Sequence, residues 1–539
     1  FQGTIAGLVD TGEASHMIEL QRALRVEGPV AVHTNNGQNT GSLTIRNTQV
    51  TLHLSDLNVG INEAGSGTAN GYLLLNSGAN VDATDVGGVS VGAARGGSAN
   101  GLIRLAANST LNVGTDAAPA DINIGWNYYD VATSVGVLDA LDPDAVVNWN
   151  LDELFIGRSD YGNSTATGTL RWNQKEAIHA NGVYIAYGGG TTGILDVPTG
   201  GTLQFGTEAD PIFNLFIADN YSGGVTPTAN LDFSLTNPTF TAYVDGELRI
   251  GASRYSGADG TLKLASNSTL NVGTEAAPAA DINIGYNYYE VATSVGVLDA
   301  LDPAAVVNWN LNELFIGRSD YGNGTATGTL RWNQSEAIHA EGVYIAYGGG
   351  TTGILDVPTG GTLQFGTEAD PIFNLFIADN YSGGVTPTAN LDFSLTNPTF
   401  TAYVDGELRI GASRYSGADG TLKLASNSTL NVGTEAAPAA DINIGWNYYD
   451  VATSVGVLDA LDPDAVVNWN LDELFIGRSD YGNSTATGTL RWNQKEAIHA
   501  NGVYIAYGGG TTGILDVPTG GTLQFGTEAD PIFNLFIAD

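Results

Sequence analysis

The sequence predicts an all-β fold, a right-handed parallel β-helix (solenoid) of roughly 16 coils with about 32 residues and three short strands per coil. The first observation is a 160-residue repeat: the text of Leu154–Gly157 recurs at 314–317 and 474–477. The second is a shorter period, because apolar-x-apolar-Gly/Ala tetrads follow one another every 29 to 34 residues. In a solenoid each unit buries its apolar face against its neighbours. The right hand follows because parallel crossovers are overwhelmingly right-handed.

The composition agrees with strands and turns. Of the 539 residues 72 are Gly, and short alternating runs of Leu, Ile, Val and Thr are bounded by Gly, Asn, Asp and Ser. The net charge of -38 argues against nucleic acid or an anionic membrane surface as a partner. Cysteine is absent, which excludes disulfides and thiolate catalysis. No stretch reaches the roughly 18 apolar residues of a membrane helix, so we expect no membrane insertion by this segment.

The N-terminal 28 residues do not fit the repeat, and we expect residues 1–28 to form a cap or lead-in segment because an open solenoid end exposes strand edges. Residues 14–25 favour a short helix with Ser15 as its N-cap, although residues 23–27 could instead form a strand. The expected organisation continues with divergent coils over 29–124, super-repeat 1 over 125–284, super-repeat 2 over 285–444 and an incomplete super-repeat 3 over 445–539.

Inward and outward positions follow from the alternation of side chains along each strand. In the first strand of a coil, Leu154 and Ile156 point inward and Phe155 points outward. The third strand is weaker, with Val147 and Trp149 inward. The outward column of the second strand alternates in charge through Asp139, Arg171, Asp196, Asp232 and Lys263. Because coils stack about 4.8 Å apart, each cation then lies between carboxylates and offsets their repulsion.

Strand text of the type found at Gly260–Gly273 (GTLKLASNSTLNVG) resembles large secreted bacterial β-solenoids, the autotransporter passengers and filamentous-haemagglutinin-like proteins. The resemblance covers nearly all of the chain after Val30, whereas the 160-residue super-repeat is not part of that pattern. It implies an extracellular or cell-surface location. We expect a structural protein that forms or extends a surface fibre by self-association. An adhesin that binds glycans or cells is the alternative, and a polysaccharide-cleaving β-helix enzyme is the second alternative.

We expect no enzymatic activity. Glycoside hydrolysis needs two carboxylates beside a groove, and the outward aspartates recur wherever the strand register demands an outward residue. His179 and its two repeats have no accompanying second His or nucleophile pattern, which favours a surface role. We expect no cofactor and no metal site. Ca²⁺ remains possible through the loop oxygens of Asp160, Asn163, Asp219 and Asn220, although turn formation explains these residues better.

The candidate functional site is a stripe of outward aromatic residues on successive coils. Such rings are costly in water unless covered, so we expect an exposed patch that marks an interface or a ligand platform. The predicted contact residues are Phe155, Tyr184, Phe216, Phe315, Tyr344, Phe376, Phe475, Tyr504 and Phe536. A secondary group in the loops that follow comprises Tyr161, Tyr187, Tyr221 and Tyr255, with Tyr128 and Tyr129 in an adjoining coil. Repeated identical patches suit heterologous contacts that propagate into a fibre. The alternative is that the tyrosines stack on one another and order the corners.

Overall fold

The computed structural model describes residues 57–62, 67–83, 88–129, 132–274, 280–289, 293–322, 324–434, 440–449, 453–481 and 484–538, and before residue 57 only the course of the strands. The chain divides into two compact units, Phe1–Asn271 and Val272–Asp539. These are called unit 1 and unit 2.

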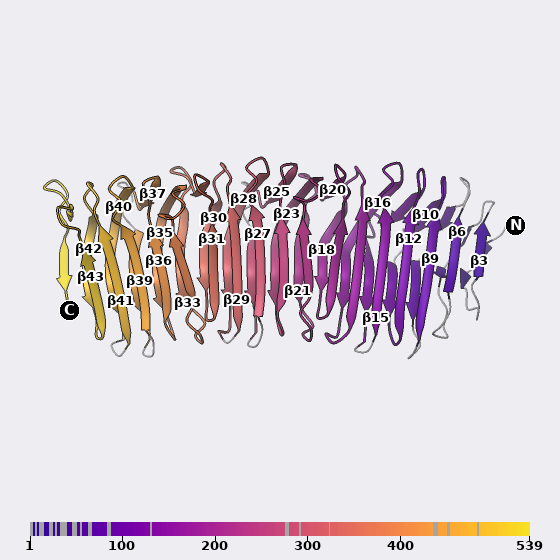
Figure 1. The fold of residues 1–539 in the computed structure, drawn as a ribbon, viewed down its shortest axis with the longest axis horizontal. Helices are drawn as coiled ribbons and strands as arrows, with labels where there is room; N and C mark the ends of the chain where they lie inside the picture. Colours follow the sequence, from indigo (N-terminus) through magenta and orange to yellow (C-terminus); the bar gives the residue numbers. More distant parts are fainter. Residues whose placement is uncertain are drawn as a thin grey trace. The chain divides into compact units, whose positions relative to one another are not determined.

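Each unit is a parallel β-solenoid, as the repeat predicts. A turn takes about 32 residues, about 14 turns are present, and the described residues contain no helix. Figure 1 shows the strands of each unit lying side by side across the stack of coils. In the described part of the chain, no helix is long and apolar enough to span a membrane. The hand of the coil stays a prediction.

Unit 1 contains three ladders of parallel strands. Ladder 1 holds the tetrads and consists of β2 (Leu8–Val9), β5 (Val30–Val32), β8 (Leu57–Asn62), β11 (Gly88–Ala94), β14 (Ala120–Asn127), β16 (Val146–Ser159), β18 (His179–Tyr187), β21 (Ile212–Asn220) and β23 (Thr239–Ser253). Ladder 2 consists of β3 (His16–Leu20), β6 (Thr40–Ile45), β9 (Thr68–Leu75), β12 (Ser98–Leu105), β15 (Thr133–Ala140), β17 (Thr165–Trp172), β19 (Thr191–Asp196), β22 (Thr228–Asp232) and β24 (Ala258–Lys263).

Ladder 3 of unit 1 consists of β7 (Thr51–His53), β10 (Asn80–Ala83), β13 (Thr110–Val113) and β20 (Thr202–Phe205). β13 pairs with the first half of β16, and β20 pairs with the first half of β23. Two short strands, β1 (Thr4–Ile5) and β4 (Arg25–Val26), pair with each other, and β25 (Ser268–Val272) includes the unit boundary.

Unit 2 repeats this arrangement. Ladder 1 consists of β26 (Ala280–Asn287), β28 (Val306–Ser319), β30 (His339–Tyr347), β33 (Ile372–Asn380), β35 (Thr399–Ser413), β38 (Ala440–Asn447), β40 (Val466–Ser479), β42 (His499–Tyr507) and β44 (Asn534–Ile537). Ladder 2 consists of β27 (Thr293–Ala300), β29 (Thr325–Trp332), β31 (Thr351–Asp356), β34 (Thr388–Asp392), β36 (Ala418–Lys423), β39 (Thr453–Ala460), β41 (Thr485–Trp492) and β43 (Thr511–Asp516). In ladder 3, β32 (Thr362–Phe365) and β37 (Ser428–Val432) pair with the first half of β35, and β37 also pairs with the first half of β40.

The third strand of a coil often runs directly into the first strand of the next coil. β16 is a single strand of 14 residues whose first half pairs with β13 and whose second half pairs with β14. A register shift between Ala120 and Ile122 of β14 marks the bend between the two halves. In the super-repeats some third and first strands merge in this way, as in β16 and β23, whereas others stay separate, as in β20 and β21. The strands together form two main sheets.

The fourth residue of each tetrad bends the chain. Gly157 has a φ of 79° and Ala186 a φ of 59°, both in the left-handed region that favours glycine. At Gly125 a Cβ atom would lie 2.1 Å from the carbonyl oxygen of Thr167, so glycine is required there by contact as well. Because the bend interrupts the alternation, residues three apart in sequence, such as Phe155 and Arg158, share the outer face.

The interior holds the apolar columns that the alternation predicts. Leu154 and Ile156 have no exposed surface, and Trp149 and Trp172 are almost fully buried with ring centroids 4.8 Å apart. One prediction is wrong: residues 16–20 of the proposed helix form β3, which pairs in parallel with β6. A neighbouring coil satisfies the backbone of this segment and overrides its local helix propensity. Ser15 and residues 21–24 lie outside the described residues, and the division into cap, divergent coils and super-repeats stays a prediction.

Candidate functional site

The predicted aromatic stripe lies on the outer side of ladder 1, but in its first copy it is not exposed. Phe155, Tyr184 and Phe216 come from β16, β18 and β21, and only 3%, 9% and 8% of their surfaces are accessible. The rings of Phe155 and Tyr184 stack with centroids 4.8 Å apart, and Tyr184 meets Phe216 edge to face at 5.2 Å. The expectation of a solvent-exposed stripe is therefore wrong here.

The second copy repeats this packing within unit 2. Phe315, Tyr344 and Phe376 form a buried cluster, with Phe315 and Tyr344 stacked at 4.7 Å and Tyr344 edge to face with Phe376 at 5.2 Å. Tyr347, the residue directly after the bend in β30, packs against this cluster. These residues form a small apolar core outside the sheet, and their role as an intermolecular contact stays an untested prediction.

Arginines cover the stripe. The guanidinium carbon of Arg158 lies 4.2 Å from the ring centroid of Phe155, and that of Arg249 lies 4.4 Å from the centroid of Phe216. A cation over an aromatic face is attracted by the ring quadrupole while its own planar surface shields the ring from water. Sequence alternation identifies the outer face correctly, but it does not reveal this cover.

Carboxylates hold the covering arginines in place. Arg249 donates from Nη1 to Asp219 at 3.2 Å and from Nη2 to Glu247 at 2.6 Å. Burial raises the pKa of Asp219, and the charge of Arg249 opposes that rise. Arg158 donates from Nε to Asp160 at 2.9 Å. Two of the loop residues considered for Ca²⁺ thus pair with arginine.

The tyrosine hydroxyls inside the stripe stay protonated. Burial, followed by the charge of Glu153, raises the pKa of Tyr184 to about 12. The same pairing appears in the third copy, where the hydroxyl of Tyr504 donates to Glu473 at 3.2 Å. The stripe is consequently a neutral aromatic layer between charged groups.

In the third copy the last phenylalanine of the stripe is more exposed than its equivalent in the second copy. Phe475 is 3% exposed, whereas Phe536, in the last described coil, is 39% exposed. In the second copy the corresponding Phe376 is 7% exposed and lies under Arg409 of β35. Phe216 and Phe376 are thus each covered by an arginine of the coil that follows, Arg249 and Arg409.

A row of half-exposed tyrosines lies at the corner that follows ladder 1. We call it the tyrosine row: Tyr129, Tyr161, Tyr187, Tyr221 and Tyr255 in unit 1, and Tyr289, Tyr321, Tyr347, Tyr381, Tyr415, Tyr449 and Tyr481 in unit 2. Tyr187 and Tyr347 are partly buried, and the other ten are 39% to 59% exposed. The predicted secondary group Tyr161, Tyr187, Tyr221 and Tyr255 falls within this row.

Many neighbours in the tyrosine row stack in groups of two or three, as the alternative interpretation of the sequence expected. In unit 1, Tyr129 and Tyr161 stack with centroids 6.1 Å apart. In unit 2, Tyr449 stacks on Tyr415 at 5.3 Å and on Tyr481 at 5.8 Å. The unit 2 members were not singled out from the sequence, although the 160-residue period identifies them.

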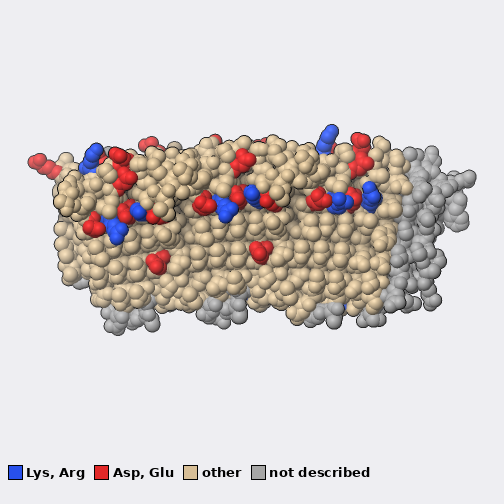
Figure 2. All heavy atoms as spheres, in the orientation of Figure 1, with Lys and Arg blue, Asp and Glu red and all other residues tan. Residues whose placement is uncertain are grey.

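The charges of ladder 2 are arranged as the alternation predicts. Arg171 donates from Nε to Asp196 at 3.0 Å and from Nη1 to Asp139 at 3.2 Å. Figure 2 shows acidic and basic side chains gathered in rows beside a wide area with few charges. The Nδ1 atom of His179 and a carboxylate oxygen of Asp210 are hydrogen-bonded at 2.7 Å. Among the described residues, no three His, Asp or Glu side chains are placed to hold a metal ion.

The chain matches no protein-family model, no curated protein and no solved structure. The class that the fold defines is a tandem-repeat β-solenoid of stacked parallel coils. This fold is compatible with a structural or an adhesive role.

Proposed function

We propose that the chain is an extracellular structural protein that forms or extends a cell-surface fibre by self-association, with the tyrosine row as the contact between chains. The observation that carries the proposal is the row itself, because it places half-exposed, mutually stacked rings at the same corner in successive coils. The resemblance to secreted bacterial solenoids supports the cell-surface location. We propose that the chain has no catalytic activity.

The tyrosine row suits a contact surface energetically. Stacking already restricts each ring, so little side-chain entropy remains to be lost on binding. Covering the exposed half of a tyrosine contributes on the order of 1 kcal/mol at about 25 cal/mol per Å² of apolar surface. Several rings per chain together offset the repulsion between acidic chains, which salt also weakens. A tyrosine retains a hydroxyl for hydrogen bonding at the rim of such a contact.

The buried stripe has a supporting role in this account. Phe155, Tyr184 and Phe216 order the strands that lead into the corner, and Tyr187 belongs both to their cluster and to the tyrosine row. The stripe therefore positions the row without itself contacting a partner.

Sedimentation velocity over a concentration series tests the proposal. The test variant replaces Tyr129, Tyr161, Tyr415, Tyr449 and Tyr481 by Ser. The matched control replaces five exposed apolar residues away from this corner, Val146, Ile194, Leu235, Val306 and Leu395, by Ser. We expect the unaltered chain and the control to associate as concentration and salt rise, and the tyrosine variant to stay monomeric with unchanged β-sheet circular dichroism. Equal association of both variants would refute the row as the contact.

A further inference from the structure

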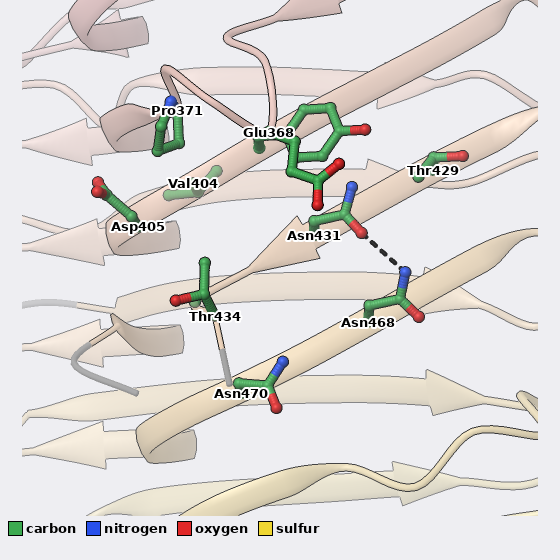
Figure 3. A pocket seen from close by; sticks show the side chains of 11 residues that line it. Glu368, Pro371, Val404, Asp405, Thr429, Asn431, Thr434, Asn468 and Asn470 are labelled. Atoms are coloured by element: carbon green, nitrogen blue, oxygen red, sulfur yellow. Dashed lines mark hydrogen bonds between the residues drawn. The ribbon is translucent and has the colours of Figure 1, made fainter. Parts of the chain in front are cut away.

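A groove on the outer side of ladder 3 in unit 2 lies apart from the tyrosine row and has a volume of about 380 Å³. Its walls come from β35, β37 and β40 and from the loop that contains Glu368. Figure 3 shows Asp405 toward one end of the groove and Thr429 toward the other. The volume falls within the roughly 300–1,000 Å³ range of small-molecule sites.

The lining combines one aromatic ring with many hydrogen-bonding groups. Tyr403 supplies the ring, and the amides of Asn431 and Asn468 line the neighbouring coils. Asn468 donates from Nδ2 to Oδ1 of Asn431 at 2.8 Å, which fixes the orientation of both amides. Each amide retains unused donor or acceptor capacity, because an amide carries two N–H groups and two oxygen lone pairs.

Two carboxylates complete the groove. Glu368 and Asp405 line it, and none of its eleven lining residues is Lys or Arg. Burial, together with the nearby Asp370, raises the pKa of Asp405. An anionic ligand would meet uncompensated negative charge here, within a chain whose net charge is already -38.

We propose that this groove binds a short segment of an uncharged pyranose polysaccharide. A pyranose presents an apolar C–H face that packs on an aromatic ring, and its hydroxyls each donate and accept hydrogen bonds. The ring of Tyr403 matches the first property, and the amides and carboxylates match the second. Glu368 and Asp405 accept from paired sugar hydroxyls and repel uronates and sulfated sugars. The site would add an adhesive function to the structural one.

The 160-residue repeat predicts a second copy of this site. Tyr243, Asp245 and Thr269 stand 160 residues before Tyr403, Asp405 and Thr429. A chain that carries more than one such sequence gains avidity for a polymer with repeated sugars, because the second contact forms at high effective concentration.

Calorimetric titration of the full chain tests the proposal, at a concentration where sedimentation shows monomers so that fibre formation does not enter. The probes are neutral oligosaccharides of glucose, mannose and galactose, with oligogalacturonate as the anionic counterpart. We expect at least one neutral series to bind and oligogalacturonate not to bind. Failure of all three neutral series, or tighter binding of oligogalacturonate, would overturn the proposal.

A variant pair locates the site. Tyr403→Ala combined with Tyr243→Ala should weaken neutral-sugar binding at least tenfold, and Asn431→Ala combined with Asn271→Ala should weaken it to a similar degree. Tyr415→Ser combined with Tyr255→Ser, in the tyrosine row, is the matched control and should leave the affinity unchanged. Unchanged affinity in both groove variants, or loss confined to the tyrosine-row control, would contradict the assignment to this groove. The outcome is independent of whether the chains self-associate.

Discussion

The guanidinium carbon of Arg409 lies 4.2 Å from the ring centroid of Phe376, so that a cation closes the outer side of an aromatic cluster. The same arginine donates from Nη1 to Asp379 at 3.0 Å and from Nη2 to Glu407 at 2.6 Å. The side chains of Arg409 and Asp379 are only 15% and 3% exposed. One residue thus shields the stripe and neutralises a buried carboxylate.

Replacing Arg409 by Ala should destabilise β33 and β35, because it leaves Asp379 buried without its partner. We expect a loss of roughly 3–5 kcal/mol in the opening free energy of these strands, the usual cost of breaking a buried ion pair. Hydrogen exchange followed by mass spectrometry measures it strand by strand. Arg409→Lys keeps the positive charge but loses the planar guanidinium group, so its loss of opening free energy should be smaller than that of the Ala variant. Wild-type exchange rates in the Ala variant would contradict this account.

Two equivalent phenylalanines should respond differently to the same change. Phe376→Ser removes a buried ring and should cost about 3 kcal/mol of local stability. Phe536→Ser removes a ring that is already 39% exposed and should cost less than about 1 kcal/mol. Exchange protection in β33 and β44, each compared with the unaltered chain, distinguishes the two. Equal losses at both positions would contradict the difference in burial between the two rings.

Two bends should respond very differently to the exchange of glycine and alanine. Gly445 has a φ of 68°, and a Cβ atom there would lie 2.2 Å from the Thr487 carbonyl oxygen, so Gly445→Ala should cost more than about 2 kcal/mol. Ala346 already occupies the left-handed region with a φ of 59°. Ala346→Gly relieves about 1 kcal/mol of that strain, which the entropy of glycine and the loss of a buried methyl group offset, so we expect a change of less than about 1 kcal/mol. Urea denaturation of both variants measures the two losses, and an Ala346→Gly variant destabilised as much as Gly445→Ala would contradict the strain argument.

Local stability around β38 should fall as the pH rises from about 4 to about 6. Burial, followed by the charges of Glu407, Glu473 and Asp472, raises the pKa of Asp441 to about 6, while its bond from the Glu473 amide opposes the rise. A raised pKa means that the folded state binds the proton more tightly than the unfolded state, so the stabilisation is present at low pH and is lost as pH passes through the folded pKa.

Asp441→Asn should remove this pH dependence in β38 while keeping the acceptor for the Glu473 amide. Hydrogen exchange corrected for the intrinsic pH effect is the measurement. The exposed Asp464, whose backbone amide donates to Asp462 at 3.1 Å, is a suitable control position for an Asn substitution. A pH dependence that persists in Asp441→Asn and disappears in Asp464→Asn would reverse the assignment.

The sequence alone predicts the solenoid because its two periods and its alternation are direct consequences of coil stacking. Inward columns such as Leu154 and Ile156 follow from alternation, and the paired charges around Arg171 follow from stacking those columns. The same reasoning places Phe155 on the outer face. It fails at the next step, because alternation carries no information about what covers that face.

Two local features explain that failure. The left-handed bend at Gly157 interrupts the alternation, so Arg158 joins Phe155 on the outer side instead of turning inward. The covering arginine of Phe216 is Arg249, which comes from the following coil 33 residues later. Neither contact follows from a period of two, and the groove around Tyr403 likewise depends on how three coils and a loop meet in space.

The central claim, that chains contact one another through the tyrosine row, is tested most directly by photo-oxidative dityrosine cross-linking of an equal mixture of ¹⁵N-labelled and unlabelled chains. Tyr415 and Tyr449 stack within one chain at 5.3 Å and provide an internal positive control, visible as cross-links of a single isotope composition. Our account predicts additional cross-links of mixed isotope composition, formed between row tyrosines of different chains under conditions where the protein assembles. Assemblies that yield the control cross-link but no mixed ones within the row would contradict it.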